Sequence, residues 1–135
     1  MPHIGRHVLF ELWRCNGGVD SADVFRAAIP EIVDAIGATL LHQHVHRFNP
    51  QGVTGLAVLA ESHLSLHSWP EHGYLAADVF TCGRRVDPLQ AGPVLERIFE
   101  PDTLHVLEIA RGVDAPDGSP AIVPSGNAYC LEPGH

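Results

Sequence analysis

The chain has few basic residues, few cysteines and no long apolar run. Eight Lys and Arg residues stand against sixteen Asp and Glu, which gives a formal net charge of −8 with histidine neutral. Surfaces that bind nucleic acid need clustered basic side chains, so we expect no nucleic-acid partner. No stretch approaches the roughly 18 apolar residues of a membrane span, so we expect no membrane association.

The scarcity of cysteine indicates in which cellular compartment the protein is found. Cys15, Cys82 and Cys130 are widely spaced, and their odd number cannot close a complete set of disulfides. The N-terminus, MPHIGRHVLFELW, lacks the uninterrupted apolar core of a signal peptide. Both features are typical of a reduced, cytoplasmic protein.

Length and composition indicate one globular domain. The chain has 135 residues, of which 45% are apolar and 18% charged, a balance typical of a folded domain with a hydrophobic core. We expect this domain to span residues 1–111. From residue 112 to 135, Pro, Gly, Asp and Ser dominate without periodicity, which predicts a C-terminal Pro/Gly-rich tail.

Two segments have the features of helices. In the first, apolar residues recur every three to four positions after Asp20 or Ser21, either of which can cap the helix, and Gly37 can end it. Pro30 should kink or split this helix. The second helix opens at Asp87-Pro88, a cap followed by a proline at the first helical position.

Six segments have the patterns of strands. They are residues 7–14, 38–48, 53–60, 64–69, 74–82 and 104–109. The predicted order is β-α-β-β-β-β-α-β, which is typical of an α+β fold, a two-layer αβ sandwich with helices on one face of a mainly antiparallel sheet. The uncovered face of such a sheet is often an oligomer interface.

The segment ESHLSLHSWPEHGYLAADVFTCG, from Glu61 to Gly83, holds groups that can cut a peptide backbone. The Ser62 hydroxyl can attack the preceding carbonyl, and the resulting ester can lose the serine α-proton and eliminate to leave dehydroalanine, which hydrolyses to a pyruvoyl group. The reaction needs a donor for the oxyanion, a role open to Thr54, and a base for the α-proton. His67 is the candidate base, because its near-neutral pKa suits proton transfer.

The same residues also fit an ordinary β-hairpin. Ser62 would then lie in a turn, His67 on a strand surface, and Cys82 would be a small buried hydrophobic residue, as free cysteines commonly are. Residues 62 and 67 point to opposite faces of a flat strand, so processing would need a bend near His63. The chemistry alone leaves both interpretations open.

Three stretches resemble the prokaryotic S-adenosylmethionine decarboxylase proenzymes, which are pyruvoyl enzymes. They are GRH at Gly5–His7, HRFNPQGVTG at His46–Gly55 and the Glu61–Gly83 segment, and the resemblance covers about residues 4–112. The pattern ESHLS-H-WPE-GY-A-DVFTCG is highly specific for that family.

The resemblance implies that the chain cleaves itself between Glu61 and Ser62. The products would be a β chain, residues 1–61, and an α chain, residues 62–135, whose first residue becomes the pyruvoyl cofactor. The substrate amine would form a Schiff base with the pyruvoyl ketone, which draws electrons as carbon dioxide leaves. The implied substrate is S-adenosylmethionine, and the product is the aminopropyl donor for spermidine synthesis.

The resemblance also assigns roles to single residues. His67 matches the processing base, Thr54 the hydroxyl residue that assists processing, and Cys82 the general acid that reprotonates the product. Aromatic rings are suited to adenine and to the sulfonium cation, and a carboxylate is suited to the ribose hydroxyls. The residues at these substrate-binding positions are Phe48, Trp69 and Glu71.

The sequence also departs from the family pattern. Thr54 adds a methyl group where serine is common, which we expect to slow processing without abolishing it. Gly92-Pro93 interrupts a helix that the family keeps regular. The segment after Gly112, including Cys130, extends beyond the matching region. By resemblance, the processed protomers form a homodimer with active sites at or near the interface.

Two other functions compete with this one. The same pyruvoyl machinery can act on ornithine or arginine, although the substrate-binding residues above favour a nucleoside. Alternatively, the chain is a non-enzymatic metal-binding module, because His42, His44 and His46 alternate and would share one face of a strand. Such a pattern is more often a polar sheet face, so we assign no metal ligand to the site.

Overall fold

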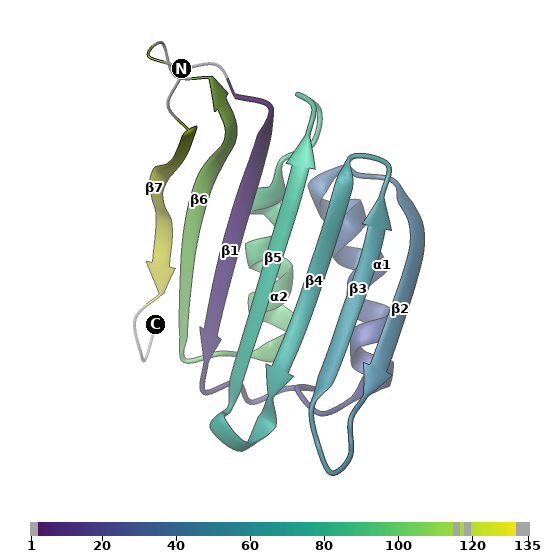
Figure 1. The fold of residues 1–135 in the computed structure, drawn as a ribbon. Helices are drawn as coiled ribbons and strands as arrows, with labels where there is room; N and C mark the ends of the chain where they lie inside the picture. Colours follow the sequence, from purple (N-terminus) through teal and green to yellow (C-terminus); the bar gives the residue numbers. More distant parts are fainter. Residues whose placement is uncertain (1–2, 115–116, 118–119, 132–135) are drawn as a thin grey trace.

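The structure, a computed structural model, describes residues 3–114, 117 and 120–131. Its strands are β1 (Gly5–Trp13), β2 (Leu40–Arg47), β3 (Val53–Leu59), β4 (Ser62–Trp69), β5 (Tyr74–Cys82), β6 (Thr103–Asp114) and β7 (Pro120–Leu131). Its helices are α1 (Ala22–Ile36), α2 (Ala91–Phe99) and the short 3₁₀ turns η1 (Pro70–His72) and η2 (Pro88–Gln90) (Figure 1). Among the described residues, no helix is long and apolar enough to cross a membrane.

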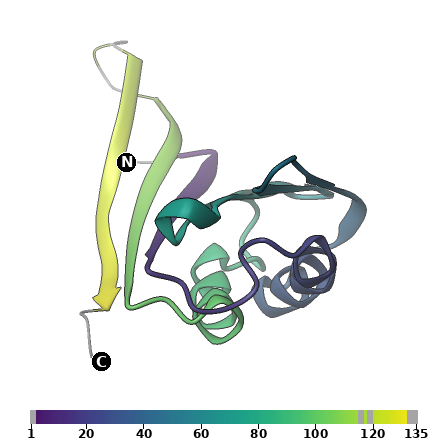
Figure 2. The same ribbon diagram turned by 90° about the horizontal axis from the view of Figure 1, so that it is seen from below.

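All seven strands belong to one sheet. Their order is β2-β3-β4-β5-β1-β6-β7, and every neighbouring pair is antiparallel. Both α-helices pack on the same face of this sheet (Figure 2). The α+β, two-layer sandwich expected from the sequence is thereby confirmed.

The hydrophobic core lies between the sheet and the helices. Val8, Phe10 and Leu12 alternate along β1 and are fully buried in one cluster with Phe25 and Ile29 of α1. Burial of each large apolar side chain contributes about 1.5–3 kcal/mol. The intervening strand residues point to the opposite side of the sheet, termed the open face, which α1 and α2 leave uncovered (Figure 2).

Helix α1 does not split at Pro30. It runs without interruption from Ala22 to Ile36. Pro30 has no N–H to donate to the carbonyl of Arg26, and the side-chain amide of Gln43 donates to that carbonyl instead, at 3.3 Å. A neighbouring strand therefore supplies the missing hydrogen bond.

The second predicted break is also absent. Gly92 and Pro93 lie in the first turn of α2, which begins at Ala91 after η2. A proline there interrupts no hydrogen bond, because the first-turn N–H groups have no partner within the helix. The helix therefore starts later than Asp87-Pro88 suggests, and it remains regular.

Part of the predicted tail is strand. β6 continues to Asp114, and β7 pairs with it from Leu104↔Leu131 to Asp114↔Pro120, with several register shifts. β7 lies at the edge of the sheet, where a strand pairs on one side only and tolerates proline. Its sequence can therefore form a strand without a clear alternation of apolar residues. Cys130 belongs to β7, whose side chains lie outside the described part of the chain.

Candidate active site

A two-residue turn, Ala60-Glu61, joins β3 to β4 and is held from both sides. The backbone N–H of Ala60 donates to the Thr39 carbonyl at 3.0 Å, and the Thr39 N–H donates to the Glu61 carboxylate at 3.0 Å. The backbone N–H of Cys82 donates to the carbonyl oxygen of Glu61, also at 3.0 Å. The peptide carbonyl before Ser62 is therefore fixed on a hydrogen-bond donor.

Ser62 has a strained backbone. Its φ is +143°, a value that residues with a side chain rarely adopt. Such conformations cost on the order of 1–3 kcal/mol and persist only where the surrounding structure imposes them. The strain lies at the residue that follows the fixed carbonyl of Glu61.

The thiol of Cys82 lies beside the same carbonyl. Its Sγ is 3.5 Å from the Glu61 oxygen, and the residue is exposed. Cys15 contrasts with it, because burial, reinforced by the nearby charge of Asp102, raises the pKa of its thiol to about 11. Of these two cysteines, Cys82 is the one positioned for chemistry.

A second group of predicted residues gathers on the open face, further along β4. Thr54 and His67 are directly opposite each other on β3 and β4, and Thr54 Oγ1 lies 3.1 Å from His67 Nδ1. Both line a cavity of about 330 Å³, together with all three predicted substrate-binding residues. These are Phe48, Trp69 and Glu71. The rings of Phe48 and Trp69 are 47% and 43% exposed and so are available to a ligand.

Within one chain, these two groups do not meet. His67 is five residues along β4 from Ser62, or about 16 Å at about 3.3 Å per residue. Their positions also differ in parity, as the sequence indicates. β4 pairs with β5 without a shift from Ser62↔Thr81 to Trp69↔Tyr74, so the strand has no bulge near His63 that would bring the two side chains onto one face.

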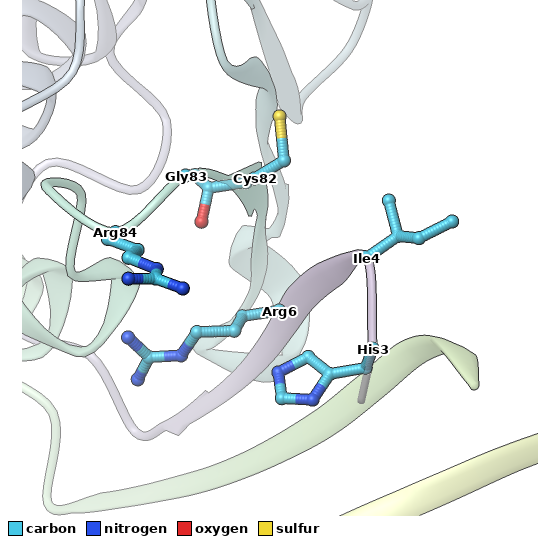
Figure 3. Close-up of a pocket in the computed structure, with 7 residues that line it drawn as sticks. His3, Ile4, Arg6, Cys82, Gly83 and Arg84 are labelled. Atoms are coloured by element: carbon cyan, nitrogen blue, oxygen red, sulfur yellow. The ribbon is translucent and has the colours of Figure 1, made fainter. Parts of the chain in front are cut away.

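Cys82 is also one of the residues that line a larger pocket, of about 610 Å³. Its lining comes from the ends of β1 and β5: His3, Ile4, Arg6, Thr81, Cys82, Gly83 and Arg84. Figure 3 shows the Cys82 thiol pointing away from the guanidinium groups of Arg6 and Arg84. Arg6 is engaged by Glu108 through two hydrogen bonds, of 2.9 and 3.0 Å.

Sequence reasoning missed five polar side chains that meet on the open face: His7, His63, Ser65, Asp78 and Arg111. The Asp78 carboxylate accepts hydrogen bonds from Ser65 and from His7 Nε2, the latter at 2.7 Å, and it lies 3.3 Å from His63 Nε2. Burial alone would raise the pKa of Asp78, but the hydrogen bonds from Ser65 and His7 hold it below its usual range. The available signal was that His63 and Ser65 alternate with buried leucines on β4.

The alternating histidines of β2 do not form a ligand cluster. His42, His44 and His46 are exposed side chains of that strand. In the part of the chain that the structure describes, the three-residue group whose ligand atoms lie within 4.8 Å of one another is His7, His63 and Asp78.

Comparison with known proteins identifies the family. A family model described as S-adenosylmethionine decarboxylase matches residues 6–112. The chain belongs to this family. The S-adenosylmethionine decarboxylases are enzymes, so the expectation of an enzyme from a prokaryotic-type proenzyme family is confirmed.

Individual S-adenosylmethionine decarboxylases agree with this assignment. The chain is 45% identical to the S-adenosylmethionine decarboxylase proenzyme of Methanococcus maripaludis strain C7 over 114 residues, 84% of this chain and 93% of the relative. It is 46% identical to that of Thermomicrobium roseum, over 84% of this chain and 97% of the relative. The adenosylmethionine decarboxylase structure from Aquifex aeolicus superposes with a TM-score of 0.77 at 28% identity, over 89% of this chain and 100% of that one.

Proposed function

We propose that this chain is the proenzyme of a pyruvoyl-dependent decarboxylase that converts S-adenosylmethionine to its decarboxylated form and carbon dioxide, for spermidine synthesis in the cytoplasm. The observation that carries the proposal is the Glu61 carbonyl, held 3.0 Å from the Cys82 N–H and directly followed by the strained Ser62. Membership of the S-adenosylmethionine decarboxylase family supports the activity.

The residues around the Glu61-Ser62 bond fit self-processing. When the Ser62 hydroxyl attacks the Glu61 carbonyl carbon, negative charge develops on the oxygen that the Cys82 N–H already contacts. Departure of the Ser62 nitrogen forms the ester and releases the strained backbone at that residue. Loss of the Ser62 α-proton then eliminates the ester, which releases the Glu61 carboxylate and leaves dehydroalanine at the start of the second chain. Addition of water and loss of ammonia convert this dehydroalanine to the pyruvoyl group.

The residues also fit the reaction that follows. The pyruvoyl group formed from Ser62 supplies an electron sink for decarboxylation. Cys82 has its Sγ 3.5 Å from the Glu61 oxygen, and we assign it as the proton donor to the product. Its exposure leaves the thiol open to a bound substrate.

The cavity that contains His67 matches a nucleoside substrate better than an amino acid such as ornithine or arginine. Phe48 and Trp69 offer partly exposed ring faces for adenine and for the sulfonium charge. Glu71 places a carboxylate at the same cavity, where it can accept hydrogen bonds from ribose hydroxyls. An aliphatic amino acid would leave these rings unused.

We further propose that the functional unit is a homodimer in which each site draws on both protomers. About 16 Å separates Ser62 from His67 of the same chain, so a base at His67 must act on the partner's Ser62. The open face offers apolar surface for the second copy, since Leu56 and Val58 are about half exposed there. In a face-to-face dimer, the Thr54–His67 pair of one protomer would meet the Glu61-Ser62 bond of the other.

Intact mass tests the central claim. We expect two chains that correspond to residues 1–61 and 62–135, whereas Ser62→Ala should give one chain of 14.6 kDa. Carbon dioxide release, assayed in turn with S-adenosylmethionine, ornithine and arginine, identifies the substrate. A wild-type protein that remains one uncut chain without a reactive ketone would refute the proposal.

A further inference from the structure

The polar cluster on the open face contacts the strand that begins at Ser62. His63 and Ser65 come from β4 and reach Asp78, which lies on β5 directly opposite Ser65. On the other side, His7 of β1 donates to the same carboxylate at 2.7 Å. Two side chains of β4 therefore converge on one acceptor that a third strand holds in place.

Arg111 sets the direction of these hydrogen bonds. Its guanidinium lies 3.0 Å from His7 Nδ1 and carries donors only, so Nδ1 is the acceptor. With Nδ1 as an acceptor, the ring nitrogen that donates is Nε2, and it points to Asp78. The ring of Phe80 packs against both histidine rings, at centroid distances of 5.1 and 5.8 Å, and Arg111 stacks on that ring. The carboxylate is thus oriented from several sides.

Two histidines and an aspartate invite a metal, but Arg111 argues against one. A histidine that binds metal through Nε2 normally carries a proton on Nδ1 and donates it to an acceptor. His7 Nδ1 instead receives a proton from Arg111, so metal binding through Nε2 would require a doubly deprotonated ring. The positive charge of Arg111 beside His7 opposes a cation further.

The Glu61-Ser62 cut gives this cluster a role. Cleavage opens the turn that joins β3 to β4, and Ser62 changes from a strand residue to a chain end. Chain ends fray unless side chains or pairing hold them. His63 and Ser65 would then be the second and fourth residues of the α chain, and both are bound to Asp78.

We propose that Asp78 is a positioning residue that fixes the N-terminal end of the α chain, and with it the pyruvoyl group, once the backbone is cut. This inference rests on the proposed function, because it requires cleavage at Glu61-Ser62. His7 and Arg111 act through Asp78 by orienting its carboxylate. In the uncut chain the Ala60-Glu61 turn adds to the pairing of β4 with β3 and β5, so Asp78 matters most after cleavage removes that turn.

The test is Asp78→Asn, which keeps the shape of the side chain but places an amide donor where the carboxylate faces donors only. It is made in the wild-type chain and in the uncut Ser62→Ala background. Asp23→Asn is the control, since the Asp23 carboxylate also accepts a side-chain hydrogen bond, from Arg26, but lies exposed on α1. Hydrogen exchange of the amides of residues 63–65 is measured for each protein, and kcat and KM are measured for the proteins that carry Ser62.

We expect Asp78→Asn to speed exchange at residues 63–65 by roughly tenfold or more in the cut protein and less than about twofold in the uncut one. A pyruvoyl group that is no longer held in position should lower kcat by about tenfold or more while KM changes little. Asp23→Asn should match wild type in both measurements. A purely structural Asp78 would speed exchange equally in both backgrounds.

The outcomes separate two failures. A wild-type chain that stays uncut would overturn the proposed function itself. A cut Asp78→Asn protein whose residues 63–65 exchange at the wild-type rate would overturn the positioning role alone. Stoichiometric metal in the wild type that disappears in Asp78→Asn would also overturn it, in favour of a metal site.

Discussion

Ser62 carries a side chain in a backbone conformation that suits glycine. The φ of +143° places the residue where an L side chain meets its own backbone. The turn before it is held at Thr39 and at Cys82, so the strain cannot relax by local movement. When the peptide bond next to such a residue breaks, the strain energy of the backbone is released, which does not happen at an unstrained peptide.

This strain predicts an inverted order of stability for two uncut variants. Glycine within a strand is normally less stable than alanine by about 0.5–1 kcal/mol. At residue 62 we expect Ser62→Gly to be more stable than Ser62→Ala by about 1 kcal/mol, because glycine adopts positive φ freely. Urea denaturation of the two proteins measures the difference. Equal stabilities, or the ordinary order, would show that the conformation of Ser62 costs nothing.

Cys82 contributes two groups, which substitution can separate. Its backbone N–H contacts the Glu61 carbonyl and survives any side-chain change, whereas its thiol does not. We expect Cys82→Ala to cleave but to lose decarboxylase activity by about 100-fold or more, a typical effect of removing a general acid. Intact mass and carbon dioxide release measure the two steps. Cys15→Ala should retain both steps, and a fully active Cys82→Ala would remove the thiol from the mechanism.

At the scale of elements, a loop carboxylate positions the β2–β3 hairpin. Asp20 accepts from the Gly52 N–H at 2.9 Å and from Arg47 at 2.8 Å, at the turn that carries Phe48. The Gly52 hydrogen bond, and after it Arg47, holds the pKa of Asp20 below its usual value. The hairpin tip therefore depends on an ionised side chain outside the sheet.

A carboxyl group whose pKa is lower in the folded chain stabilises the fold at pH values above its pKa in the unfolded chain. This stabilisation is lost as the pH falls through its pKa in the folded chain. Since the unfolded pKa of aspartate is about 3.9, Asp20→Asn should be less stable than wild type at pH 7. The gap should close as the pH drops below about 4. The variant should also raise KM, because the turn that Asp20 holds carries Phe48, a proposed substrate-binding residue. Thermal melts across pH 3 to 7 provide the measurement, and a gap as large at pH 3 as at pH 7 would contradict the ionic role.

The elements that the sequence predicts best are those whose apolar residues recur with a clear period along one face. The strand at residues 74–82 matches β5, and the continuous apolar face after Ser21 matches α1. Pro30 misleads because its compensation comes from Gln43, 13 positions away and on another element. Asp78 was missed for a similar reason, because its partners depend on the register of three strands, which no local pattern reveals.

At the scale of the whole molecule, the distance between Ser62 and His67 predicts complementation. Ser62→Ala and His67→Ala should each remain uncut alone. In a mixed dimer, His67 of the Ser62→Ala chain can act on Ser62 of the His67→Ala chain, so we expect the latter to be cleaved. Co-expression with distinguishable tags, followed by intact mass, reads out which chain is cut. If neither chain is cleaved in confirmed mixed dimers, His67 acts within its own chain or has another role.

The order of strands has a consequence for a cut protein. β1 belongs to residues 1–61, yet it lies between β5 and β6, which belong to residues 62–135. After cleavage the two polypeptides interleave within a single sheet, and neither can leave without opening hydrogen bonds on both sides of β1. Once unfolded, they must find each other again, so refolding becomes a second-order reaction that slows on dilution. A cleaved enzyme would then persist because its strands separate slowly, and the uncut chain would be the form in which the fold is assembled.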